Sequence, residues 1–270
     1  MKKILLLTDF SDGSFNALIY ALNAANILGN SLEIINAYSM PPAASNVMKD
    51  ITDVLKRNAD EDMMKFRRRV EALPIANEVE KEYNTHFGSV VDVINKRGED
   101  GDVNAVFMGT QGASGITEKW LGSNAASAAR NVKIPLLAIP VDRPYQPIEN
   151  ILFSTDLKVM KHSECLTFVA KLAKKTGAEV RFFHVRTSED TVDESVYKAQ
   201  IKEYFDIKPT FSFTYNKDIE EGIENIISTE KPSILVVVRH EHGFFESIWH
   251  SSVSRHIINH ASLPILVLNG

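Results

Sequence analysis

A glycine-rich segment in the first half of the chain has the residue types of a phosphate-binding turn. It reads Gly109, two residues, Gly112, nine residues, and then Gly122-Ser123-Asn124. Glycines that follow a strand let the backbone pass close to a ligand and adopt positive φ. A Gly-Ser-Asn sequence at the start of a helix offers free backbone N–H groups and the positive end of the helix dipole. The pattern therefore predicts a cradle for phosphate, with the Ser123 hydroxyl as an added donor.

The neighbouring elements must place this turn between a strand and a helix. Residues 103–108 form a continuous apolar run, which is typical of a parallel strand covered on both faces, and residues 125–131 are predicted to form the helix. Two standard nucleotide motifs are absent. No G-x-x-x-x-G-K-[ST] occurs, which excludes a P-loop, and no G-x-G-x-x-G follows the first strand, which excludes a dinucleotide-binding Rossmann domain.

Residues suited to catalysis are few. Asp9, which follows Thr8 at the end of the first apolar run, could support metal–nucleotide chemistry, but no second carboxylate stands at a suitable spacing. No set of residues resembles a catalytic triad. We therefore predict no catalytic residues and, at most, slow hydrolysis of a bound nucleotide.

The chain carries the same pattern twice. Residues 3–9 and 150–156 are both short apolar runs that end in Thr-Asp, at an offset of 147 (156 minus 9). Each run is followed by an amphipathic helix that is predicted to stop at Gly29 or Gly177, and then by an apolar strand. The copies also close alike, each with a proline followed by an apolar strand. The first copy alone has a long polar helix around residues 45–73.

Each copy alternates strands and helices, which predicts an α/β fold made of two tandem doubly wound (Rossmann-like) domains. Residues 142–147 contain two prolines and read as a linker. We place the boundary near residue 145, so that the first domain covers residues 1–144 and the second covers residues 145–270.

The amino-acid composition excludes several classes of protein. Of 270 residues, 44% are hydrophobic and 24% are charged, which supports buried cores and excludes a disordered chain. No apolar run approaches the roughly 18–20 residues that a membrane helix needs. The single cysteine, Cys165, cannot form an internal disulfide, which fits a reducing compartment. We expect a cytoplasmic protein without a membrane partner, and the net charge of -5 argues against nucleic acid as a partner.

The glycine spacing, the Asp at the end of the first strand and the closing Ile-Pro-Leu-Leu-Ala-Ile segment together resemble the universal stress protein (UspA-like) family, in a tandem two-domain form. The resemblance implies a five-stranded parallel sheet in each domain, with strand order 3-2-1-4-5. It also implies that the first domain binds ATP or a related adenine nucleotide, with or without Mg²⁺. Carried over by position, the binding residues are Thr8, Asp9, Ala37, Met108, Gly109, Gly112, Gly122, Ser123 and Asn124.

The resemblance further implies a nucleotide-responsive module of the stress response that acts on a protein partner. Two alternatives stay open, namely a slow ATPase or adenine-nucleotide hydrolase, and an interaction scaffold that binds no nucleotide. The two domains are expected to pack like the subunits of a single-domain dimer, through their last strands at residues 136–139 and 265–268. A further homodimer is also open.

The second copy departs from the glycine pattern. Aligned with one gap, Arg239, His242 and Ser251 stand where the first copy has Gly109, Gly112 and Gly122. Side chains would fill the phosphate cradle there, and non-glycine residues disfavour positive φ. Since Thr155 and Asp156 are kept, the adenine side could persist without the phosphate side. We therefore predict a degenerate second site and one ATP per chain.

Five of the eight histidines lie between residues 240 and 260. His-x-His and a pair at i, i+4 are usable spacings for a transition metal, with Glu241 or Asp156 as an oxygen ligand. No cysteine is nearby, and His256 and His260 fall on a predicted surface helix. We therefore predict no metal site, and binding of a different anion by Arg239 and these histidines stays open. The candidate metal ligands are His240, His242 and His250.

Overall fold

A computed structural model of the chain describes residues 2–40, 48–110, 122–157, 163–187, 194–206, 208–239 and 263–269. The chain divides into two compact units. The first comprises Met1–Thr117 and Gly122–Asp142, and the second comprises Glu118–Leu121 and Arg143–Gly270. Within the described ranges, no helix combines the length and the apolar character that a membrane crossing would need.

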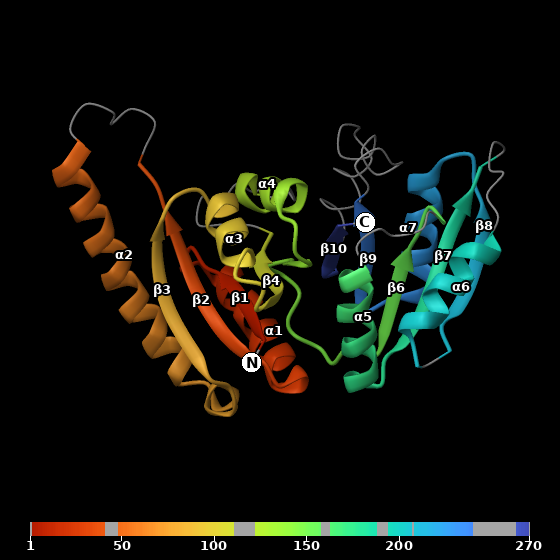
Figure 1. Ribbon diagram of the computed structural model, residues 1–270, viewed down its shortest axis with the longest axis horizontal. Helices are drawn as coiled ribbons and strands as arrows, with labels where there is room; N and C mark the ends of the chain where they lie inside the picture. Colours follow the sequence, from red (N-terminus) through yellow and green to blue (C-terminus); the bar gives the residue numbers. More distant parts are fainter. Residues whose placement is uncertain are drawn as a thin grey trace. The chain divides into compact units, whose positions relative to one another are not determined.

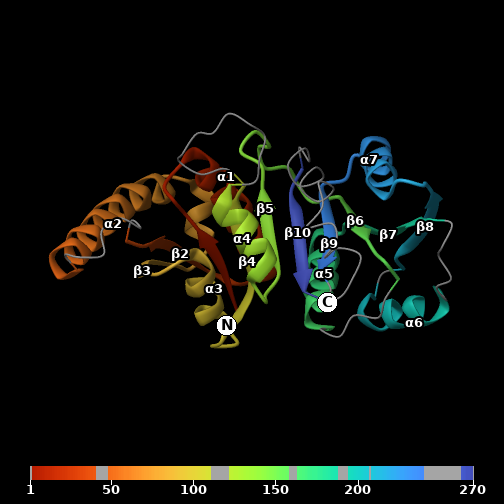
Figure 2. The same ribbon diagram turned by 90° about the horizontal axis from the view of Figure 1, so that it is seen from above.

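The first unit is built on a parallel sheet with strand order β3-β2-β1-β4-β5 (Figure 1). Helices α1 and α2 cover one face of this sheet, and α3 and α4 cover the other (Figure 2). The elements in chain order are β1 Lys3–Leu7, α1 Asp12–Leu28, β2 Ser31–Tyr38, α2 Met48–Glu71, the 3-10 helix η1 Pro74–Glu78, β3 Lys81–Phe87, α3 Val90–Gly98, β4 Val103–Gly109, α4 Ser123–Asn131 and β5 Leu136–Ile139.

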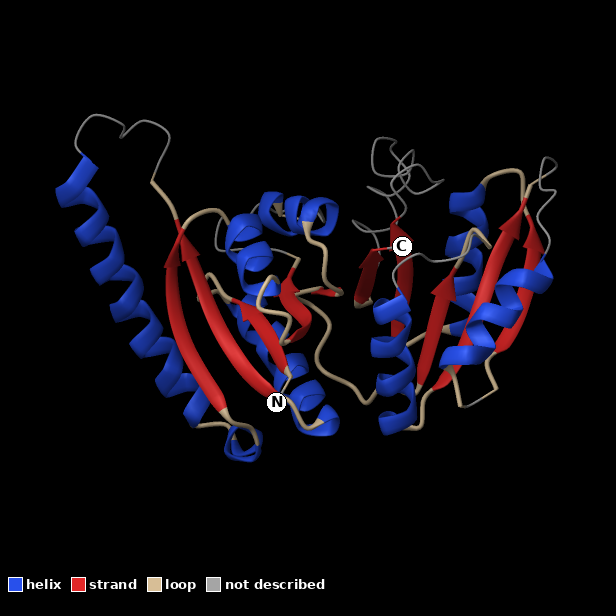
Figure 3. Ribbon diagram, viewed as in Figure 1, coloured by secondary structure: helices blue, strands red, loops and turns tan. Residues whose placement is uncertain are grey.

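The second unit repeats this plan with strand order β10-β9-β6-β7-β8, again parallel throughout. The predicted α/β class and the strand order 3-2-1-4-5 are therefore confirmed for both copies. Figure 3 shows the alternation of helices and strands in each unit. The elements are β6 Asn150–Ser154, α5 Ser163–Thr176, β7 Glu179–Arg186, α6 Glu194–Tyr204, β8 Thr210–Tyr215, α7 Ile219–Glu230, β9 Ile234–Arg239 and β10 Ile265–Asn269.

Local sequence explains where the first helix of each unit begins and ends. The Ser11 side chain caps α1 by accepting a hydrogen bond from the Ser14 N–H group. The helix ends at Gly29, whose φ of 65° is left-handed and whose N–H bonds back to the last turn. Gly177, with φ of 74°, stands in the same place after α5. Both predicted helix stops are confirmed.

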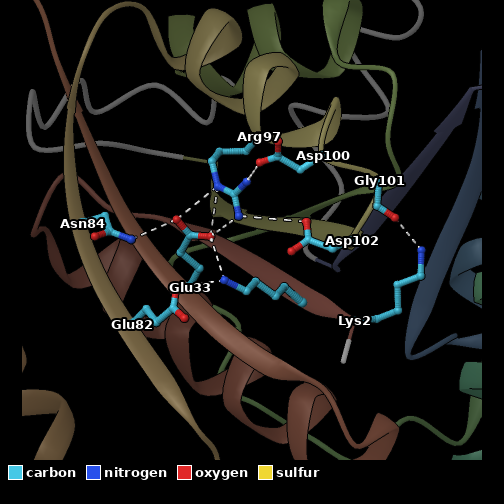
Figure 4. Close-up of polar contacts among 9 residues, drawn as sticks. Lys2, Glu33, Glu82, Asn84, Arg97, Asp100, Gly101 and Asp102 are labelled. Atoms are coloured by element: carbon cyan, nitrogen blue, oxygen red, sulfur yellow. Dashed lines mark hydrogen bonds and ion pairs between the residues drawn. The ribbon is translucent and has the colours of Figure 1, made fainter.

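A buried ion pair links β2 to α3 in the first unit. Glu33 of β2 is 2% exposed, and it accepts hydrogen bonds from Arg97 Nη2 at 2.6 Å and from Asn84 Nδ2 at 3.0 Å. Figure 4 shows Arg97 and Asn84 both pointing at this carboxylate. Burial alone would raise the pKa of Glu33, but the hydrogen bonds from Arg97 and Asn84 outweigh it and hold the pKa below its ordinary value. The carboxylate is therefore charged and fully partnered at neutral pH.

Candidate functional site

A cavity of about 280 Å³ lies at the carboxyl ends of β1 and β4, where doubly wound sheets usually bind ligands. All but one of the predicted binding residues line it, namely Thr8, Asp9, Ala37, Met108, Gly109, Gly122, Ser123 and Asn124. The remaining one, Gly112, is outside the described residues. Sequence reasoning missed the other lining residues, which are Leu7, Ser14, Val90, Thr110 and Ala125.

One wall of the cavity is held by a chain of hydrogen bonds between β1 and α1. The Phe10 N–H donates to Thr8 Oγ1 at 2.9 Å, and the Thr8 and Ser14 hydroxyls lie 2.9 Å apart. Ser14 Oγ donates its proton to the Ser11 carbonyl at 2.9 Å, so the Thr8 hydroxyl is the donor to Ser14. Thr8 and Ser14 are both buried. These hydrogen bonds therefore fix the β1–α1 turn without a ligand.

Asp9 stands on this turn with an exposed side chain. Its Oδ1 accepts hydrogen bonds from the Ser11 N–H at 3.2 Å and from the Ser11 hydroxyl at 2.5 Å. Ser11 also caps α1, so the same residue sets both the helix start and the direction of the carboxylate. Asp9 is thus positioned at the rim of the cavity by local structure.

The opposite wall is the start of α4. Gly122 is its N-cap residue, and no side chain caps this helix end. The N–H groups of a first helical turn have no acceptor within the helix, and here they belong to residues that line the cavity, Ser123, Asn124 and Ala125. The Gly122 N–H itself donates to the Thr110 carbonyl at 2.6 Å. This wall offers a partial positive charge and free donors to an anion.

Neither described glycine of the turn uses the positive φ that glycine permits. Gly122 has φ of -54° and ψ of 151°, which any residue can adopt. Gly109 does not have a positive φ either. Glycine at these positions must therefore be required because a side chain would not fit, and not because of the backbone conformation.

At Gly109 that space is taken by the protein itself. A Cβ atom added there would lie 2.9 Å from both the carbonyl carbon and the carbonyl oxygen of Gly13, and 3.2 Å from the Ser14 nitrogen. The absence of a side chain lets the end of β4 pack against the first turn of α1. Gly109 also lines the cavity, where the sequence suggested that it lets a ligand approach the backbone. In the structure, its lack of a side chain lets β4 pack closely against α1.

The other side of the cavity is apolar. Leu7, Ala37, Val90 and Met108 line it, from β1, β2, α3 and β4 respectively. Leu7 and Met108 are each 5% exposed, so they form a floor continuous with the core. The cavity therefore joins an apolar surface to an anion-attracting helix terminus within one small volume.

The second unit repeats the turn after its first strand. Thr155 Oγ1 accepts the Leu157 N–H at 2.9 Å, as Thr8 does for Phe10. Leu157 and Phe10 both have left-handed backbones, with φ of 61° and 66°, although neither is glycine. The Thr-Asp element of the duplication is thus preserved in its geometry as well as in its sequence.

A side chain from the second strand also holds this turn in each unit. Asn36 Nδ2 donates to the Thr8 carbonyl at 2.8 Å, and His184 Nδ1 lies 2.7 Å from the Thr155 carbonyl. Asn36 and His184 are both buried. The two copies therefore use different side chains at equivalent positions for one purpose.

Strand register corrects the predicted alignment of the second glycine turn. In the first unit Leu6 pairs with Phe107, and in the second its equivalent Phe153 pairs with Val236. Phe107 and Val236 are therefore equivalent residues. The sequence alignment had placed its gap one residue away from the position that the sheet requires.

Val238, not Arg239, consequently occupies the position of Gly109. Val238 is 3% exposed and belongs to the core of β9. Arg239 is equivalent to Thr110, and its Nη2 donates to Asn269 Oδ1 at 2.9 Å. The glycine is still lost from the second copy, but a buried branched side chain replaces it.

The remaining predictions for the second turn fall outside the described residues. They concern the histidines proposed as metal ligands and the other two replaced glycines, at positions His240, His242, His250 and Ser251. Among the residues that the structure describes, no group of three or more His, Cys, Asp or Glu side chains could hold a metal ion.

Together, these features define a doubly wound α/β protein with a ligand-sized cavity beyond the carboxyl ends of its strands. The family model of the universal stress proteins matches residues 1–140, so the chain belongs to that family, as the sequence pattern had indicated.

Individual sequences and a solved structure show the same similarity. Universal stress protein G of Salmonella typhimurium is 43% identical over 56 residues, which are 21% of this chain and 39% of that protein. The chain thus matches well under half the length of this relative. A universal stress protein of Methanocaldococcus jannaschii is 26% identical over 142 residues, covering 51% of this chain and 81% of the relative. The crystal structure of a universal stress protein from Archaeoglobus fulgidus has the same fold, with a TM-score of 0.74, 20% identity and coverage of 99% of this chain and 98% of that one.

Proposed function

We propose that the first domain binds ATP or a related adenine nucleotide, and that the chain acts as a nucleotide-responsive module of the stress response. The observation that carries the proposal is the cavity at the ends of β1 and β4, where an apolar surface meets an uncapped helix terminus. An adenine ring needs the first, and phosphates are attracted by the second. The volume of about 280 Å³ is close to the lower limit for small-molecule pockets.

Each wall has a part in this proposal. The ring would rest against Leu7, Ala37 and Val90, with Asp9 on the adenine side. The phosphates would accept hydrogen bonds from the N–H groups at the start of α4 and from the Ser123 hydroxyl. Magnesium, where present, would be held mainly by phosphate oxygens, since the described residues contain no metal-binding cluster.

Replacing Gly122 with valine should weaken ATP binding at least about tenfold, or about 1.4 kcal/mol. The backbone of Gly122 suits any residue, so the variant should fold, but a branched side chain would occupy space beside the phosphate donors. Isothermal titration calorimetry measures the affinity, and circular dichroism checks folding. Gly122→Ala should have a smaller effect, and Ser127→Val, on the same helix but away from the cavity lining, should have none. Unchanged affinity in Gly122→Val would place the phosphates elsewhere.

The chain should bind one ATP, in the first domain, despite its two similar folds. Val238 stands where the first copy has Gly109, and a branched side chain there would not allow the close approach that Gly109 makes to Gly13 in the first site. Titration after complete removal of nucleotide should give a stoichiometry near one. In the Gly122→Val variant the affinity of all the binding should fall, with no half of the signal keeping the natural affinity. A stoichiometry near two would show that the second domain also binds.

A further inference from the structure

The outer edge of the second unit is a strand without a described partner on one side. β8 pairs with β7 and is the last strand in its sheet (Figure 1). The Asn216 N–H bonds to the Arg186 carbonyl of β7, so alternate residues of β8 point their backbone groups toward β7. The other set, Phe211, Phe213 and Tyr215, therefore directs its N–H and C=O groups outward, where no described strand meets them.

This edge lacks the protection that edge strands usually have. β8 reads Thr-Phe-Ser-Phe-Thr-Tyr, with no charge and no proline. The edge strand of the first unit, β3, carries Lys81 and Glu82, and α2 bonds to it through Asp60–Thr85 and Glu71–Tyr83 contacts. Charged side chains and covering elements are the means by which proteins block pairing between sheet edges. β8 itself has no charged residue and no proline, although Lys198 of α6 contacts one of its faces, so its outward backbone groups can accept another strand.

The sequence of β8 also indicates which strand could pair with its open edge. Residues 210–214 read Thr-Phe-Ser-Phe-Thr, which is a palindrome centred on Ser212. Two antiparallel copies related by a two-fold axis at Ser212 would pair every residue with its own kind. Aromatic pairs and Thr–Thr or Ser–Ser pairs directly opposite each other stabilise antiparallel sheets. We propose that β8 is the contact through which two copies of this chain associate, in antiparallel register about Ser212.

The backbone geometry agrees with this register. Phe211 of one copy would stand opposite Phe213 of the other, and both direct their backbone groups outward, so each such pair would exchange two N–H···O bonds. Ser212 would face its own copy in the closely spaced kind of pair that has no backbone hydrogen bonds between its members. Thr210 and Thr214 would face each other at the two ends of the contact.

The rings of Phe211 and Phe213 on one face of β8 are partly covered by other side chains. Phe211 stacks on Phe182 of β7, with ring centroids 5.3 Å apart. Lys198 Nζ of α6 lies 4.9 Å from the centre of the Phe213 ring, and the Arg186 guanidinium lies 4.6 Å from it. These cations cover the rings against other apolar surfaces but do not block approach in the plane of the sheet.

Charge substitution at Thr210 and Thr214 tests both the contact and its register. Both side chains are exposed, so substitution should leave the fold intact, which circular dichroism checks. Sedimentation velocity of the full chain should show a concentration-dependent dimer. The variant T210K/T214K puts lysine opposite lysine at both ends and should weaken the dimer at least about tenfold. The variant T210E/T214K pairs opposite charges only in the register about Ser212, and it should restore the dimer.

Three results would overturn the proposal. The chain could be monomeric at every concentration tested, or T210K/T214K could dimerise like the natural sequence, which would assign the dimer to another surface. A T210E/T214K variant as weak as T210K/T214K would reject the register. In the full chain with a Cys165→Ala background, Ser212→Cys should form a disulfide-linked dimer under mild oxidation, and a failure to cross-link would count against the contact. A free peptide of residues 209–216 that competes with the dimer would support the strand edge as the site.

Discussion

Arg97→Met should destabilise the first unit by about 3–5 kcal/mol, because it leaves the Glu33 carboxylate buried without its main partner. The Glu33 side chain is 3% exposed and that of Arg97 is 16% exposed, so water cannot replace the lost hydrogen bonds. Scanning calorimetry of the full chain measures the change. Glu33→Gln/Arg97→Met should recover part of the loss, because no charge then remains buried.

Lys174→Met is the matched control for this ion pair. Lys174 and Asp206 are 2.5 Å apart, but their side chains are 66% and 75% exposed. Solvent screens an exposed pair of this kind, so its loss should change stability little. If Arg97→Met cost no more than Lys174→Met, the burial of Glu33 would not have the energetic weight that we assign to it.

The pH dependence of the stability difference between the natural protein and Arg97→Met can also be predicted. The pKa of Glu33 is lowered in the folded state, so its stabilising effect is present above its ordinary pKa near 4.5 and is lost as pH falls through the folded pKa. In Arg97→Met the burial that opposes ionisation remains, so the pKa of Glu33 rises and protonation relieves the variant. The stability difference between the natural protein and Arg97→Met should therefore narrow as pH falls. The narrowing begins above the ordinary pKa, where Glu33 of the variant takes up a proton, and continues below it, where the natural protein loses its ion pair.

Gly109→Ala should destabilise the first unit by about 1–3 kcal/mol, the usual cost of overpacking. The new Cβ would lie 2.9 Å from backbone atoms of Gly13, which cannot rotate away as a side chain could. Relief requires a shift of β4 or of the first turn of α1. Because Ser14 of that turn lines the cavity, ATP affinity should fall as well. Thermal unfolding and titration calorimetry measure the two effects.

Gly98→Ala is the control for the same chemical change. Gly98 is the last residue of α3, and an added Cβ would make ordinary contact with Ile134 at 3.6 Å. Alanine is favoured over glycine in helices by about 0.5–1 kcal/mol. The two glycine-to-alanine variants should therefore change stability in opposite directions. Equal effects would mean that the contact with Gly13 does not decide the outcome at Gly109.

Much of the fold could be predicted because its signals are local. Apolar runs that end in Thr-Asp gave the first strand of each copy, and Gly29 and Gly177 gave the ends of the helices. Strand order followed from the alternation together with the family pattern. Most of the residues that line the cavity were expected because the resemblance to the family carries them over by position.

The features that escaped prediction depend on contacts distant in sequence. Glu33 lies in a buried strand, and its partner Arg97 is 64 residues away, so no local pattern joins them. The need for glycine at Gly109 comes from the backbone of Gly13 on another element. The equivalence of Val238 with Gly109 became visible only through strand pairing, since an alignment gap after a strand can move by one residue without altering the apolar pattern.

The left-handed residues Phe10 and Leu157 bear on the history of the chain. A non-glycine residue held in this conformation costs about 1–3 kcal/mol, and both copies keep that cost at the same place. A duplication explains this coincidence when the single domain that was duplicated already carried the turn. The second copy has the turn but has Val238 in place of Gly109. The conformation of this turn is therefore retained independently of the glycine at the end of the fourth strand.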